Sequence, residues 1–108
     1  MRGLNTGAWS GNVGSRISFG ATDEGEPACS FDLAVESKGS HMVWVRVNVY
    51  GPGLVSLCRD RLSQGLYVQV SGSLMNRRRQ TEIRAEQLVF GGSPDSKTPT
   101  RMLSSNEP

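Results

Sequence analysis

The stretch Met42–Tyr50, MVWVRVNVY, decides the fold. Its four valines, at positions 43, 45, 47 and 49, alternate with larger or polar side chains. A period of two with β-branched residues on one side is typical of a half-buried strand. We therefore expect all four valines to face the core. The opposite face then carries Trp44, Arg46, Asn48 and Tyr50.

The residues before this stretch predict two more strands. Ala28–Val35 alternates in the same way, and Gly39-Ser40 separates it from Met42–Tyr50, so the two segments are expected to form an antiparallel hairpin. Leu4–Asn12 is a weaker first strand, because glycines flank its Trp9. Glycine within a strand often marks a bend or a close backbone approach.

The residues after it predict a short helix and two strands. Gly51-Pro52-Gly53 ends the long strand, and apolar residues then recur at helical spacing over Leu54–Gln64. Leu66–Leu74 and Thr81–Phe90 return to alternation, and a change of phase in the last strand predicts a bulge near Glu86-Gln87. The expected apolar stripe of the helix is Leu54, Leu57, Cys58 and Leu62.

This order of elements predicts an all-β fold, namely an OB-fold. Such a fold is a five-stranded Greek-key barrel, here with one short helix between the third and fourth strands. Its second and third strands, and the loops joining strands one to two and four to five, bind oligonucleotides or oligosaccharides.

Composition limits the alternatives. The 108 residues suit one domain, which we expect over residues 1–92, followed by a flexible tail of proline and polar residues over 93–108. No stretch has the length or hydropathy of a spanning helix and no secretory signal is visible, so we expect a cytoplasmic protein without membrane contact. Cys29 and Cys58 predict reduced core thiols, and the single His41 has no partner at metal-ligand spacing. No nucleophile–base set or phosphate loop is present, so neither enzyme activity, a metal nor a cofactor is expected.

Four segments resemble the bacterial-type single-stranded DNA-binding proteins over about residues 4–92. They occur in the same order and spacing as in that family. They are Gly11-Asn12-Val13, Phe31–Val35 with its Leu-Ala pair, Trp44–Gly51, and Gln64–Leu74.

The resemblance implies an OB-fold, often a homotetramer, that binds single strands without sequence preference. It also implies that bases stack on Trp44 and Tyr50. Two further stacking aromatics of the enterobacterial type would fall near Gly39 and Arg79 and are absent here. The acidic tip with which the family recruits replication and repair proteins has no counterpart in residues 104–108.

The basic residues complete the expected nucleic-acid site. Arg77-Arg78-Arg79 falls in the turn between the last two strands, beside the binding face, where it can meet phosphates or remain a solvated charge run. Arg46 and Asn48 lie between the two aromatics and can meet a phosphate or a base edge. Arg84 and Arg16 are further candidates for phosphate contact.

Three hypotheses remain open. The first is sequence-independent binding and protection of single-stranded DNA in replication, repair or recombination, by a homo-oligomer. The second is an OB-type interaction module similar to primosomal replication protein B, in which protein contacts dominate and the aromatic face packs against a partner or a second subunit. The third is an RNA-binding domain of the cold-shock type.

Overall fold

The structure, a computed structural model, describes residues 3–91. The tail expected over residues 93–108 lies outside the described residues. Five strands are present: β1 (Gly7–Ala21), β2 (Pro27–Glu36), β3 (Met42–Tyr50), β4 (Tyr67–Arg77) and β5 (Gln80–Phe90). A short 3-10 turn, η1 (Lys38–Ser40), joins β2 to β3, and one helix, α1 (Pro52–Arg61), joins β3 to β4.

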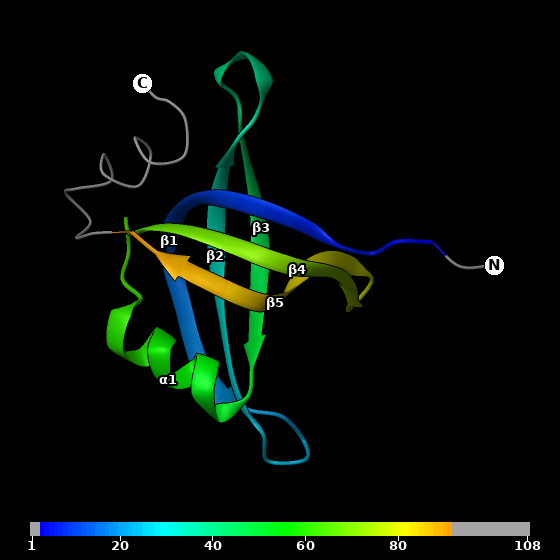
Figure 1. Cartoon of the computed structure of the whole chain (residues 1–108), viewed down its shortest axis with the longest axis vertical. Helices are drawn as coiled ribbons and strands as arrows, with labels where there is room; N and C mark the ends of the chain where they lie inside the picture. Colours follow the sequence, from blue (N-terminus) through cyan, green and yellow to red (C-terminus); the bar gives the residue numbers. More distant parts are fainter. Residues whose placement is uncertain (1–2, 92–108) are drawn as a thin grey trace.

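The strands close into a barrel in the order β1-β2-β3-β5-β4 (Figure 1). Neighbouring strands are antiparallel except β3 and β5, which run parallel and pair only at Val47↔Ile83 and Asn48↔Arg84. The predicted fold, a five-stranded barrel with one helix between the third and fourth strands, is confirmed. Within residues 3–91 no helix has the length and hydropathy needed to cross a membrane.

The first strand is longer than predicted and is shared between two neighbours. Gly7–Asn12 pairs with β4, whereas Asn12–Ala21 pairs with β2, and the register shifts between Val13 and Ile17. Gly11 allows the chains to approach here, because a Cβ at that position would lie 2.0 Å from the carbonyl oxygen of Ala34. A bent strand with two partners closes the barrel but breaks the simple alternation by which strands are recognised in a sequence.

The bulge expected near Glu86-Gln87 is confirmed. Ser71 pairs with Gln87 and Gly72 pairs with Ala85, so Glu86 is the extra residue of β5. The bulge bends the β4–β5 pair and restores the inward direction of the apolar side chains beyond it.

Helix α1 packs three of the four expected residues, Leu54, Cys58 and Leu62, in or against the core. It begins at Pro52 and buries Val55 and Cys58, whereas Leu57 is exposed. Successive helical residues are rotated by about 100°, so a side chain two positions from Val55 points away from the barrel. The expectation for Leu57 was therefore wrong.

The core fills the barrel and continues under α1. Phe31, Leu33 and Ile83 are fully buried, and Trp9 packs against this cluster at its edge. Cys29 and Cys58 are free thiols buried in the same core. The hydrogen bond that Cys58 makes with Cys29, together with burial, raises the pKa of the Cys58 thiol.

Three of the four valines of β3 lie in the core or pack against it. Val47 and Val49 are completely buried, whereas Val43 is exposed and Val45 is half-buried. Figure 1 shows the reason: the β2–β3 hairpin extends past the barrel, so the first residues of β3 have no opposite layer to pack against. The expectation that all four valines face the core was wrong for Val43, whereas Val45 packs against the core.

Candidate nucleic-acid interface

Trp44 is the most exposed aromatic side chain among the described residues, with 62% of its surface accessible. It lies on the outer face of β3 where the hairpin begins to project. One edge of its indole rests over Gly14 of β1, where an added Cβ would come within 2.8 Å of Cζ3. Gly14 therefore lets the ring lie against the sheet while leaving it accessible to a ligand.

Tyr50 lies at the other end of the same outer face. Six residues separate it from Trp44, which corresponds to about 20 Å at ~3.3 Å per residue. Tyr50 is half-buried, and the guanidinium of Arg84 lies 4.8 Å from its ring centroid. This cation–π contact places Arg84 of β5 beside Tyr50 of β3, and Arg84 pairs with Asn48, two residues before Tyr50.

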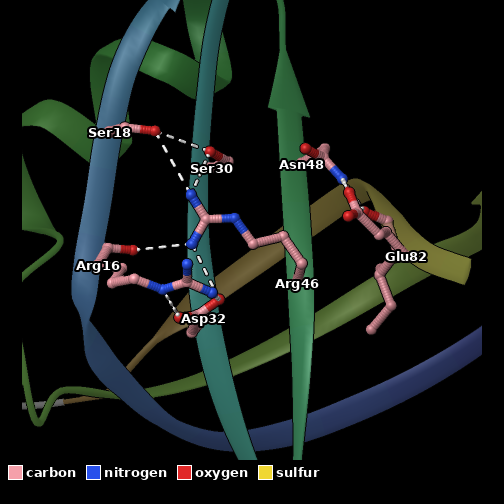
Figure 2. A network of polar contacts seen from close by, with 8 residues as sticks. Arg16, Ser18, Ser30, Asp32, Arg46, Asn48 and Glu82 are labelled. Carbon is pink, nitrogen blue, oxygen red and sulfur yellow. Dashed lines mark hydrogen bonds and ion pairs between the residues drawn. The ribbon is translucent and has the colours of Figure 1, made fainter. Parts of the chain in front are cut away.

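Arg46, between the two aromatics, is held by protein groups (Figure 2). Its Nη1 donates to Oδ1 of Asp32 (2.9 Å) and to the carbonyl oxygen of Arg16 (3.1 Å). Its Nη2 donates to Oγ of Ser30 (2.8 Å). These contacts tie β1, β2 and β3 together, so Arg46 is a structural residue of this face in the structure as it stands.

The same carboxylate also binds Arg16. Nε of Arg16 donates to Oδ2 of Asp32 at 2.6 Å, while the Arg16 side chain remains 75% exposed. Partial burial alone would raise the pKa of Asp32, but the hydrogen bonds and charges of the two arginines outweigh it and lower that pKa. Asp32 is thus an anion that neutralises much of the charge expected to meet phosphate here.

Asn48 does not lie on the accessible surface. It is 3% exposed, and its Nδ2 donates to Oε1 of Glu82 (2.7 Å) and to the carbonyl oxygen of Ile83 (3.4 Å). The β3–β5 pairing covers it, because the two strands meet at this residue. Glu82, which is 8% exposed, was not predicted from the sequence. Its place between Thr81 and Ile83 on the last strand would have put it on the outer face, opposite in direction to Ile83.

Arg77–Arg79 forms the predicted turn between β4 and β5. Arg77 pairs with Gln80, and Arg78 and Arg79 are the two turn residues, with φ of 53° and 67°. Such turns favour Asn-Gly, since positive φ at both positions is unfavourable for side chains with a Cβ. Three exposed guanidiniums are therefore held at the tip of a hairpin in a backbone conformation that a glycine would adopt more readily.

A groove of about 430 Å³ joins Tyr50 to this turn. Arg77 lines one side, and Asp23 and Glu24 of the β1–β2 loop line another. These two acidic residues and Arg77 make the groove mixed in charge.

The expected site residues thus form three groups. Trp44, Arg46 and Arg16 lie together near the projecting hairpin, and Asn48, Tyr50 and Arg84 lie at the β3–β5 pairing. The third group is Arg77, Arg78 and Arg79 at the hairpin tip. Within residues 3–91 no three His, Cys, Asp or Glu side chains are placed to hold a metal ion.

The barrel order, the helix between β3 and β4 and the aromatic outer face of β3 define an OB-fold protein. Residues 4–90 match the model of the Single-strand binding protein family. The chain belongs to this family.

Three solved structures share the barrel. The N-terminal domain of the PriB protein from Thermoanaerobacter tencongensis, described as dimeric, is 20% identical, with a TM-score of 0.68 over 82% of this chain and 98% of that one. A deletion mutant of the Thermus aquaticus single-stranded DNA binding protein is 24% identical, with a TM-score of 0.71 over 83% of this chain and 42% of that one. The Plasmodium falciparum SSB, in complex with ssDNA, is 25% identical, with a TM-score of 0.71 over 83% of this chain and 96% of that one. A sequence comparison with curated proteins found no match.

Proposed function

We propose that this protein binds single-stranded DNA without requiring a sequence, and protects it during replication, repair or recombination. The observation that carries the proposal is the accessible indole of Trp44 on the outer face of β3, in a barrel of the single-strand binding family. The Plasmodium falciparum relative, whose complex contains ssDNA, supports the same ligand. Binding rather than catalysis is the proposed activity, in the cytoplasm near the nucleoid.

The strand is proposed to follow β3 from Trp44 toward Tyr50. Bases stack on the exposed indole, a contact worth about 1–3 kcal/mol per base and indifferent to base identity. At the far end, a base stacks against the Tyr50–Arg84 pair, in which the Arg84 guanidinium covers one face of the Tyr50 ring. The Arg77–Arg79 turn then neutralises phosphates, while Arg46 keeps the three strands in register.

A homo-oligomer fits this function better than a monomer. One barrel offers two stacking aromatics on β3, so several copies would let one strand contact more platforms. The dimeric PriB neighbour shows that a barrel of this shape can associate. Replication or repair proteins remain proposed partners.

The test is a titration of intrinsic fluorescence with oligo-dT at several salt concentrations. Stacking on Trp44 is expected to quench emission saturably. Three turn arginines on phosphates predict a slope of log affinity against log salt near −2, at about −0.7 per contact. Trp44→Phe should remove the quench and keep most of the affinity, whereas Trp9→Phe should keep both. A flat titration at low salt, with no binding by a second method, would overturn the proposal.

The module similar to primosomal replication protein B is kept as a second candidate for one reason. Met42 and Val43, beside Trp44, are exposed apolar side chains on the projecting hairpin, and such patches often mark protein interfaces. This candidate predicts that Val43→Ser lowers the mass measured by light scattering or the affinity for a purified replication partner. An unchanged mass and unchanged partner binding would remove it.

A further inference from the structure

A cavity of about 270 Å³ opens on the outer face next to Trp44. It lies between β3 and β5, which pair at only two residue positions and diverge beyond them. The part of its lining that matters here is Trp44, Arg46, Arg16, Asp32, Thr81 and Glu82. The exposed indole therefore forms one wall of a polar hollow.

Glu82 is the unusual member of this lining. Glu82 is 8% exposed as a whole residue, and its Oε1 accepts from Nδ2 of Asn48 at 2.7 Å. Among the described residues, Oε2 has no hydrogen-bond donor. Because Glu82 lines the cavity, a ligand bound there that brings an N–H group to Oε2 would supply the donor that this oxygen lacks.

The charges of the cavity favour a neutral ligand with donors over a phosphate. Arg16 and Arg46 are both bound to Asp32, so two carboxylates, those of Asp32 and Glu82, face two arginines that are already paired. A phosphate entering here would meet the Glu82 carboxylate without a free cation to offset the repulsion. A nucleobase carries no charge and can stack on the adjacent indole.

We propose that this cavity is a base subsite in which the Glu82 carboxylate accepts hydrogen bonds from the edge of the base on Trp44, and that it prefers guanine over thymine. Guanine presents two adjacent N–H donors, at N1 and N2, that match a carboxylate. Thymine presents one N–H between two carbonyl oxygens, which the carboxylate repels. Cytosine and adenine, each with one amino group beside an acceptor nitrogen, rank between them.

This inference rests on the proposed function and makes it more specific. The other contacts remain indifferent to sequence, so the effect is a graded preference at one subsite. A good bidentate pair discriminates by enough to change affinity about fivefold or more.

The experiment compares oligo-dT with the same oligonucleotide carrying isolated dG substitutions, spaced so that no quadruplex forms. Competition titrations at one salt concentration are expected to show about fivefold or more tighter binding of the substituted strand. Deoxyinosine, which keeps N1–H and lacks the 2-amino group, should lose most of that gain. Equal binding of all three strands overturns the inference and leaves the proposed function standing, whereas failure to bind any strand overturns both.

A matched pair of variants assigns the effect to Glu82. In Glu82→Gln the amide can still accept from Asn48, while its NH₂ group offers donors in place of the second acceptor. The preference should then fall to within about twofold or reverse toward thymine. Glu86→Gln makes the same charge change at the exposed bulge residue of β5 and should keep the guanine preference. Should Glu82→Gln fail to fold, as judged by circular dichroism, the deoxyinosine comparison on the unaltered protein still decides.

Discussion

Replacing Asp32 with asparagine should make the protein less stable and a better DNA binder at the same time. In the folded protein the Asp32 carboxylate holds Arg46 and Arg16 at 2.9 and 2.6 Å. The side chains of Asp32 and Arg46 are only 14% and 21% exposed, so Asp32→Asn leaves a mostly buried guanidinium without its counter-ion. This cost lies between that of a surface pair and a buried one, at about 1–3 kcal/mol of unfolding free energy.

The same change releases positive charge toward the face on which the strand is proposed to lie. Arg16, already 75% exposed, can turn to a phosphate, and Arg46 can follow in part. Two further contacts would steepen the slope of log affinity against log salt by up to about 1.4. At low salt the affinity for oligo-dT should rise about three- to tenfold, equivalent to about 0.7–1.4 kcal/mol.

The assay pairs urea unfolding with salt-dependent titration, and Asp60→Asn is the control. Asp60 lies exposed on α1, so its replacement makes the same change in net charge without touching the network. Asp32→Asn should differ from the control in both stability and salt slope. If the two variants gave the same slope and the same affinity, the reasoning that Asp32 neutralises the binding face would be refuted.

Three further outcomes are expected. Trp44→Ala should lower the affinity for oligo-dT by about 1–3 kcal/mol. It should reduce stability less than Trp9→Ala does, because only Trp9 packs against the core. Equal binding of oligo-dT by the two variants would contradict the stacking role of Trp44. The double change Arg78→Gly and Arg79→Gly should raise the unfolding free energy by about 1 kcal/mol, by relieving positive φ. It should also make the slope of log affinity against log salt shallower by about 1.4, because two phosphate contacts are lost. A lower melting temperature in this variant would show that the turn is not strained. The pKa of Asp32 is lowered in the folded protein, so the ionised carboxylate stabilises the fold fully above its unfolded pKa of about 3.9. This stabilisation is lost as the pH falls below that value and through the folded pKa. The urea midpoints of the parent and of Asp32→Asn should therefore converge in acid.

The sequence predicted the barrel because the strongest signals in it are local. The alternation in Met42–Tyr50, the phase change near Glu86 and the Gly-Pro-Gly stop before the helix each depend on a few neighbouring residues, and the strand, the bulge and the stop were all found. The first strand was cut short at Asn12 because β1 changes partner there. This change of partner depends on how the sheet closes into a barrel, so neighbouring residues in the sequence do not reveal it.

The candidate site was less predictable, for a related reason. Alternation correctly placed Trp44 and Arg46 on the outer face. It could not show that Arg46 forms an ion pair with Asp32 of the neighbouring strand. Nor could it show that β5 covers Asn48 and brings Glu82 against it. Contacts between distant strands decide whether an outward side chain is free, and these contacts appear only once the register is known.

The parallel pairing of β3 with β5 has a consequence for motion. Strands β3 and β5 pair at two residue positions, whereas the pairing of β2 with β3 runs from Ala28↔Tyr50 to Glu36↔Met42. Transient opening of the barrel is therefore expected to begin between β3 and β5, and the amide protons that bond across this pairing should exchange earlier than those that bond between β2 and β3. A strand bound across β3 and β5 would span this gap, so the nucleic acid itself would act as a clamp that slows exchange and raises the melting temperature.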